Sequence, residues 1–264
     1  MRFINTITLE LEDHLETIPR YAILSHTWGD GEVTLQDWSN PTIRDQLLSL
    51  LNELENENPM PDGTQEPLRV AQLNGAQIES DDYYWRRRLG LNNPIDSFGY
   101  WKILNTCLQA RKDGLGHLWV DTNCIDKTSS AELSEAINSM YIWYRNSSIC
   151  YAYLSDVRIS DPTYTATYLA TGKSISNLHG SSLDSFRKSR WFRRGWTLQE
   201  LLAPKKVCFY SRTWTPIGTK KDMAPLLAEL TRVGEQYLLS HDYAARGHRV
   251  LPARVCSSQY AVAA

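Results

Sequence analysis

Four apolar runs, each ending in polar residues, constrain the fold of this chain more than any other feature. They are "RYAILSHTW" (20–28), "GHLWVD" (116–121), "SICYAYLSD" (148–156) and "KVCFYS" (206–211). Such runs are typical of strands that are buried on both faces, and helical patterns lie between them. The sequence therefore predicts an α/β fold with three layers, in which helices flank a mainly parallel sheet of about four or five strands.

Two of the segments between these runs carry helix signals. Residues 96–114 begin at a capping residue and end at a glycine that follows two cations, as helices often do. Residues 129–144 begin with the capping-box pattern Ser129-x-x-Glu132, in which each side chain is expected to bond the other residue's backbone N–H. Both segments are predicted helices.

Two further segments interrupt the alternation of strands and helices. Residues 52–95 are rich in acids and prolines, and they are expected to form a surface insertion that is partly helical or mobile. Residues 157–188 are rich in Ser, Thr, Tyr and Gly, and they are expected to form a long excursion between a strand and a helix. We expect one domain over residues 1–230 and a weakly organised tail over 231–264.

The composition excludes some classes of partner. The chain has 264 residues with a formal net charge of −2, which gives no general attraction to nucleic acids or anionic membranes. No apolar run reaches the roughly 18 residues that a membrane span needs. We therefore expect a cytoplasmic protein without a signal peptide, a membrane span or a nucleic-acid partner.

The cysteines are odd in number and widely spaced, with no C-x-x-C pair. In a chain without a secretion signal this pattern predicts free thiols. The six histidines do not cluster near the cysteines at the spacing of zinc ligands, so we expect no metal site. The cysteines are Cys107, Cys124, Cys150, Cys208 and Cys256.

Polar residues follow the first two apolar runs directly. Ligands of open α/β sheets bind outside the carboxyl ends of the strands, so these residues are candidates for substrate binding. Each of them also has an ordinary structural role open to it, because Ser and Asp cap turns and Gly permits tight turns. The candidates are Ser25, His26, Trp28, Gly29 and Asp30 after the first run, and Asp121 and Asn123 after the second.

The segment "GWTLQELLAP" (195–204) places a single carboxylate among apolar residues. At about 100° per residue, Leu198, Leu201 and Leu202 share one face of a helix, and Trp196 and Glu200 lie on the opposite face. The leucines are expected to face the core. The opposite face is then either a solvated surface or a site.

The segment "RKSRWFRR" (187–194) carries five cations and no acid. It is a solvated basic turn, a phosphate-binding edge near Glu200 or a nucleic-acid patch, and Arg193 and Arg194 are the candidates for contact with phosphate. The usual nucleotide and hydrolase motifs are absent, since the chain has no complete G-x-G-x-x-G, no P-loop and no G-x-S-x-G.

Three blocks together resemble the fungal heterokaryon incompatibility (HET) domain. They are "YAILSHTWGDGEVTLQDW", "LWVDTNCIDKTSSAELSEAINSMYIWYRNSSICYAYLSDV" and "SRWFRRGWTLQELLAP". The resemblance implies a role in fungal nonself recognition, in which such domains trigger cell death when incompatible cells fuse. It also implies self-association or a partner incompatibility protein.

A more distant likeness connects the chain to Toll/interleukin-1 receptor (TIR) domains, and it implies a TIR-like, flavodoxin-like fold. TIR domains also begin with a strand that runs into a Ser-containing loop, and they carry a Trp-Cys-x-x-Glu-Leu helix start. The segment "WTLQEL" is similar to that start, with Trp196, Glu200 and Leu201 in the same order. In NAD-cleaving TIR domains this glutamate is catalytic, so the likeness makes Glu200 the catalytic candidate and NAD the candidate substrate, with no cofactor.

Two functions follow as hypotheses. In the first, the chain hydrolyses the nicotinamide–ribose bond of NAD: Glu200 stabilises the cationic ribose, Trp28 or Trp196 stacks on a flat ring, and the other candidates hold ribose or diphosphate. In the second, the chain is a non-catalytic, self-assembling interaction module, and Glu200 forms an ion pair with Arg193 or Arg194. Because Glu200 is assigned to the face away from the core, Glu200→Gln is expected to leave folding nearly unchanged.

Overall fold

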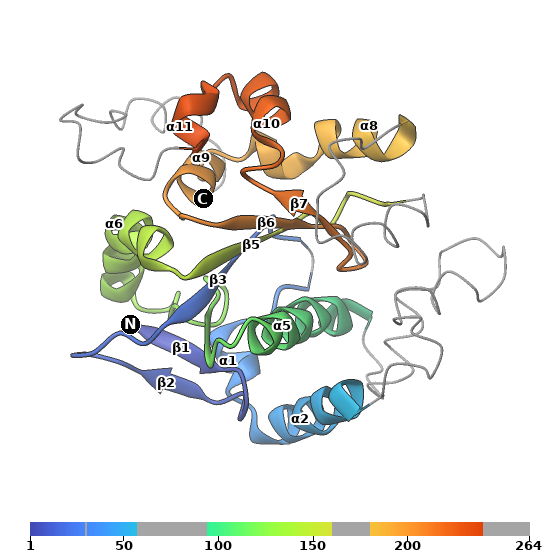
Figure 1. The fold of residues 1–264 in the computed structure, drawn as a ribbon. Coiled ribbons are helices and arrows are strands. Elements are labelled where there is room, and N and C mark those ends of the chain that lie inside the picture. Colours follow the sequence, from blue (N-terminus) through green and yellow to red (C-terminus); the bar gives the residue numbers. More distant parts are fainter. Residues whose placement is uncertain (30, 57–93, 160–179, 240–264) are drawn as a thin grey trace, which may run out of the picture.

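The computed structural model describes residues 1–29, 31–56, 94–159 and 180–239, and a seven-stranded mixed sheet forms its centre (Figure 1). The strand order across the sheet is β2-β1-β4-β3-β5-β6-β7. The strands are β1 (Arg2–Asn5), β2 (Leu11–Asp13), β3 (Tyr21–His26), β4 (His117–Trp119), β5 (Ile149–Tyr153), β6 (Val207–Tyr210) and β7 (Pro216–Thr219).

The four strands in the middle of the sheet are parallel, and they are the four apolar runs of the sequence. Strand β3 pairs with β4 on one side and with β5 on the other, and β5 pairs with β6. Every residue of β3 is buried, which explains its unbroken apolar pattern. The predicted adjacency of the first two runs is confirmed, since Tyr21 lies opposite His117 and Ile23 opposite Trp119.

The sheet is mixed rather than mainly parallel, because its edges are antiparallel. Strand β1 pairs with β2 and β4, and β7 pairs with β6, all in antiparallel register. These three strands have only three or four residues each, and such short segments carry too few positions for a period of two to be recognised.

Helices flank the sheet, so the predicted α/β class is confirmed, and the arrangement agrees with three layers. Helices α5 and α6 lie on opposite sides of β3 in Figure 1, as expected for right-handed crossovers to strands on either side of it. The helices are α1 (Leu35–Trp38), α2 (Pro41–Asn56), α5 (Pro94–Lys112), α6 (Ser130–Asn146), α8 (Gly180–Lys188), α9 (Thr197–Leu202), α10 (Ala224–Thr231) and α11 (Glu235–Leu239), with a 3-10 turn η1 (Arg190–Arg193).

The two predicted helices are present, but the capping box of the second is only half formed. The Ser129 hydroxyl accepts a hydrogen bond from the backbone N–H of Glu132, as predicted. The Glu132 carboxylate instead accepts from the backbone N–H of Asp126 at 2.8 Å and from the Arg2 guanidinium at 3.0 Å. The prediction missed the second half because the competing donors come from the preceding loop and from β1.

The two predicted insertions and the tail fall mostly outside the described residues. Residues 52–56 continue α2, and 57–93 are not described. Residues 180–188 form α8, and 160–179 are not described. Helix α11 lies within the predicted tail, and its Leu238 is buried, so the weakly organised tail stays a prediction for residues 240–264 alone.

The described cysteines agree with the expectation of free thiols. The four described cysteines, at positions 107, 124, 150 and 208, are unpaired, and Cys256 lies outside the described residues. Among the described residues, no helix is both long enough and apolar enough to cross a membrane.

Candidate functional site

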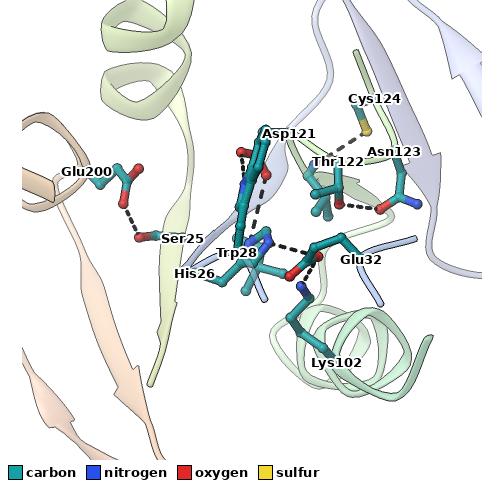
Figure 2. Close-up of polar contacts among 12 residues, drawn as sticks. Ser25, His26, Trp28, Glu32, Lys102, Asp121, Thr122, Asn123, Cys124 and Glu200 are labelled. Carbon is teal, nitrogen blue, oxygen red and sulfur yellow. Dashed lines mark hydrogen bonds and ion pairs between the residues drawn. The ribbon is translucent and has the colours of Figure 1, made fainter. Parts of the chain in front are cut away.

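The candidate site lies at the carboxyl end of β3, the parallel strand between β4 and β5, next to the point where the chain crosses from one side of β3 to the other. Ligands of doubly wound sheets bind at this kind of position. Ser25 and His26 are the last two residues of β3, and their side chains point to opposite faces because side chains alternate along a strand. Ser25 meets Glu200, whereas His26 joins a second group of charges (Figure 2).

Helix α9 turns Glu200 toward the sheet, so the sequence prediction is right for Leu201, which is buried, and wrong in placing Glu200 on the face away from the core. The buried residues of α9 are Thr197, Glu200 and Leu201, which lie on one stripe at helical spacing, while Leu198 is only half-buried. Glu200 is 3% exposed. A carboxylate on the inward face is stable only with strong polar partners, and its surroundings supply them.

The Glu200 carboxylate is held by a hydroxyl and by a guanidinium. The Ser25 hydroxyl donates a hydrogen bond to Glu200 Oε2 at 2.6 Å. The Arg194 guanidinium donates to both carboxylate oxygens, at 2.9 Å and 3.1 Å, which is the strong bidentate geometry. The buried Trp191 indole N–H donates to Ser25 Oγ at 2.7 Å, so it orients the serine hydroxyl toward the carboxylate.

Arg194 remains a cation in this environment. Burial lowers the pKa of a guanidinium, but the Glu200 charge and its hydrogen bond outweigh burial and raise the Arg194 pKa above its ordinary value. The Asp121 charge raises the Arg194 pKa as well.

A buried lysine fixes the end of α9. The Lys220 ammonium donates hydrogen bonds to the backbone carbonyls of Leu201 at 3.1 Å and Pro204 at 2.6 Å. A cation at this position satisfies carbonyls that have no partner within the helix. Burial lowers the Lys220 pKa to about 8. Lys220 therefore helps to hold Glu200 in place from the far end of its helix.

The second group of charges lies on the other side of β3 and centres on Glu32. Glu32 Oε2 lies 3.2 Å from His26 Nε2 and also accepts a hydrogen bond from the Lys102 ammonium, and His26 Nδ1 lies 3.8 Å from Asp121 Oδ1. Burial raises the pKa of a carboxyl group, but the His26 and Lys102 charges outweigh burial and hold the Glu32 pKa well below its ordinary value.

Two glycines make this second group possible. Gly31 has a φ of +79°, a conformation that permits the tight turn between β3 and Glu32. Gly99 on α5 lies against the Gly31 carbonyl so closely that a β-carbon would collide with it. Lys102 is one turn further along α5, and this close approach of α5 to the loop brings its ammonium to Glu32.

Trp28 is the exposed residue of this group, and it contacts Asp121. The Trp28 side chain donates its N–H to Asp121 Oδ2 at 2.8 Å, and its ring is 51% exposed. The Lys127 ammonium lies 3.6 Å from the centre of that ring, at cation–π distance. Asp121 Oδ1 is buried and accepts no hydrogen bond from the described residues. This arrangement provides an exposed flat surface that a carboxylate holds in place.

Two other predicted site residues hold the loop that follows β3, and a third lies outside the described residues. The Gly29 backbone N–H donates to Glu32 Oε1 at 3.2 Å. The Asn123 amide donates to the carbonyls of Val33 at 2.9 Å and Thr34 at 3.3 Å. Both residues thus hold the chain that follows β3. Asp30 is not among the described residues.

The basic run does not form a single cationic surface. Arg187 pairs with Glu229, Arg190 with Asp156 and Arg194 with Glu200. Arg193 is exposed, and Trp196 is half-buried just before α9. Of the run, only Arg194 joins Glu200. Arg194 is therefore the only cation of this run that lies beside Glu200 and could bind a phosphate there. The ion pairs of Arg187 and Arg190 do not favour a nucleic-acid-binding patch.

Five residues that hold the site together were not among the predicted site residues: Glu32, Lys102, Lys127, Trp191 and Lys220. A signal was present for Lys102, because it is a lone charge in the apolar segment "GYWKILNTC", just as Glu200 is in its own segment. No comparable signal marks Glu32 or Trp191. Their partners, Lys102 and Ser25, lie 70 and 166 residues away in the sequence.

Comparisons with known proteins agree on one family. The sequence model of the heterokaryon incompatibility protein (HET) family matches residues 101–200. The vegetative incompatibility protein HET-E-1 of Podospora anserina is 34% identical to this chain over 216 residues. The aligned part covers 82% of this chain but only 11% of that relative, so the chain corresponds to a small part of its length. No solved structure matches.

Proposed function

We propose, on the premise that this chain belongs to the heterokaryon incompatibility (HET) family, that it acts in fungal vegetative incompatibility by hydrolysing NAD. The first part of the proposal is supported by the relative named a vegetative incompatibility protein. The second part rests on the site and on the likeness of "WTLQEL" to TIR domains. Loss of NAD would stop cell metabolism without a further enzyme.

The observation that carries the enzymatic proposal is the position of Glu200. Its carboxylate is buried at the carboxyl end of the central parallel strand, where α/β proteins bind their ligands. A hydroxyl and a guanidinium hold it in a fixed orientation. A charge that is positioned in advance, away from water, is the arrangement that stabilises a charged transition state most strongly.

In the proposed reaction, the bond between ribose C1′ and the nicotinamide ring nitrogen breaks, and its electron pair leaves with that nitrogen. The ribose becomes an oxocarbenium-like cation, which the anionic Glu200 stabilises. A water oxygen then bonds to C1′, and a proton from that water passes to Glu200 and on to solvent. The products are nicotinamide, ADP-ribose and a proton.

The neighbouring residues have roles that match the parts of NAD. Arg194 is the guanidinium beside Glu200, and the substrate diphosphate offers it a second anion for bidentate pairing. As Arg194 turns toward the diphosphate, one Glu200 oxygen becomes free to face the ribose. The exposed Trp28 ring offers a stacking surface, and its hydrogen bond to Asp121 fixes the orientation of the ring.

A non-catalytic interaction module is the second candidate function, and one observation favours it. Both Glu200 oxygens are already bonded to Arg194, and the side chain is almost fully buried. On this view the ion pair ties α9 to the segment before it, and the chain acts by assembling with itself or with a partner incompatibility protein.

The test is the hydrolysis of NAD by the purified chain, over a wide range of protein concentration so that any need for self-assembly is met. Because Glu200 is buried in an ion pair, Glu200→Gln alone leaves Arg194 without its anion and is expected to destabilise the fold. The informative variant is therefore Glu200→Gln with Arg194→Gln, which replaces the ion pair by two amides. Glu135→Gln, at an exposed glutamate of α6, is the matched control.

The double variant is expected to keep the wild-type circular dichroism spectrum and to lose activity by roughly a hundredfold or more, because a positioned charge is lost. Glu135→Gln is expected to keep full activity. If wild-type protein leaves NAD intact at every concentration, or if the folded double variant hydrolyses NAD at the wild-type rate, the enzymatic proposal fails and the interaction module remains.

A further inference from the structure

A separate cluster of side chains that could bind a metal ion lies at the amino end of β4, away from the strand ends that carry Ser25 and Asp121. His117 is the first residue of that strand, whereas Asp121 follows its other end. Glu12 belongs to β2, and His14 follows β2 directly. Strand β1 lies between β2 and β4 and pairs with both, so the cluster bridges the edge of the sheet and its parallel centre.

The three side chains converge on a small volume. Glu12 Oε2 lies 3.4 Å from His14 Nε2 and 3.1 Å from His117 Nε2. All three atoms lie within 4.8 Å of one another. In a tetrahedral zinc site with bonds of about 2.1 Å, neighbouring ligand atoms are about 3.4 Å apart. The two distances from Glu12 lie close to that value, and the two imidazoles lie within 4.8 Å of each other.

The surrounding residues hold these side chains in orientation. The Phe3 ring packs edge-on against both imidazoles, with ring centroids 5.7 Å from His14 and 6.0 Å from His117. The Asn5 amide donates to the other Glu12 oxygen, Oε1, at 2.7 Å. Hydrogen bonds of this kind to the free oxygen of a carboxylate ligand are typical of built metal sites. All three candidate ligands are partly exposed, so an ion can reach them.

We propose that Glu12, His14 and His117 form a Zn²⁺-binding site with one coordination position left open to water. Two imidazoles and one carboxylate suit zinc, because it prefers nitrogen and oxygen ligands of this hardness in tetrahedral geometry. The donor set does not suit Mg²⁺ or Ca²⁺, which take oxygen ligands. The site is independent of Glu200 and of NAD hydrolysis.

Zinc at this position would act as a clasp. It would join the β1–β2 hairpin to the start of β4, and Glu12 and His117 are 105 residues apart in the sequence. A bond that closes a long loop in the folded state and binds weakly to the unfolded chain stabilises the fold. Both imidazoles contact the same Glu12 oxygen, which holds the three side chains close together.

The experiment measures Zn²⁺ binding to the full chain by equilibrium dialysis and thermal unfolding with and without Zn²⁺. The variants are Glu12→Gln, His14→Gln and His117→Gln. Asp13→Asn is the matched control, because it removes a carboxylate of the same strand that pairs with Arg2 instead. Mg²⁺ serves as the metal control.

We expect wild type and Asp13→Asn to rise in melting temperature with Zn²⁺ and not with Mg²⁺. Each ligand variant should lose this rise and bind zinc at least about tenfold more weakly, the scale for loss of a metal-site contact. If His117→Gln does not fold, the result for His14→Gln tests the proposal, because His14 lies just after β2 rather than within a strand. Zinc binding that survives all three substitutions would place the ion elsewhere in the chain. That outcome, or no binding by wild type, overturns the proposal.

Discussion

At the scale of single residues, the pair formed by Glu32 and Lys102 has the clearest consequence for stability. Lys102 is 1% exposed, and Glu32 is its anionic partner. Glu32→Gln leaves the ammonium buried without a full negative charge, so we expect the free energy of unfolding to fall by about 3 kcal/mol. Adding Lys102→Met should recover most of the loss. Urea denaturation of the three proteins at neutral pH measures both effects.

The same pair predicts a response to acid. The Glu32 pKa is held below its ordinary value in the folded state, so the unfolded chain binds the proton first as the pH falls. The stabilisation from Glu32 is therefore present above the ordinary carboxyl pKa of about 4.3 and is lost below it. Glu32→Gln should make the fall in stability with acid shallower. Glu229→Gln should change it much less, because the Glu229–Arg187 pair is exposed and screened by water. Equal acid sensitivity in both variants would contradict the assignment.

At the scale of elements, helix α9 depends on which of its faces is packed. Leu201 is fully buried beside Glu200, and Leu198 is half-buried. Leu201→Ala should lower the free energy of unfolding by about 2–5 kcal/mol through the cavity it leaves, and Leu198→Ala should lower it by much less. The two variants remove the same atoms, so chemical denaturation compares the faces directly. Equal losses would mean that α9 is rotated from the orientation that places Glu200 beside Ser25.

At the scale of the whole molecule, the buried thiols set the response to alkali. Burial raises the pKa of Cys107, Cys124 and Cys208 to about 12, and it raises that of Cys150 as well. An unfolded thiol ionises near pH 8.5, so the unfolded chain loses protons first, and the stabilisation present below pH 8.5 is lost as the pH rises. At pH 9.5 the loss is about 1.4 kcal/mol for each thiol. Burial lowers the Lys220 pKa to about 8, so the destabilisation from this lysine decreases as the pH rises and offsets part of the loss from the thiols.

We therefore expect the free energy of unfolding in reductant to fall by about 3–4 kcal/mol between pH 7.5 and 9.5, with a shallower fall in a variant that carries Cys107→Ala and Cys124→Ala. Urea denaturation at the two pH values checks this expectation. A stability that does not change with pH in the wild type would show that the thiols are not buried as described.

The cysteines are also expected to be unpaired in the whole chain. Intact mass without reductant should show five free thiols in the chain of five cysteines.

The sequence alone determined the features that depend on local periodicity. The four apolar runs predicted the parallel centre of the sheet, because strands buried on both faces need unbroken apolar residues. The period of two along a strand predicted that Ser25 and His26 face opposite sides. The serine cap of α6 was predicted because capping needs only residues three positions apart.

Only the tertiary structure decided which charges meet and which face of α9 is buried. Helix α9 has six residues, fewer than two turns, so its sequence has too few positions to define a face. Its orientation depends on partners outside it, since Arg194, Ser25 and Lys220 satisfy the groups that burial would otherwise leave unpaired. Glu32 with Lys102, and Glu12 with His117, meet across long stretches of chain. Local patterns carry no information about such pairs, because chain folding alone brings them within bonding distance.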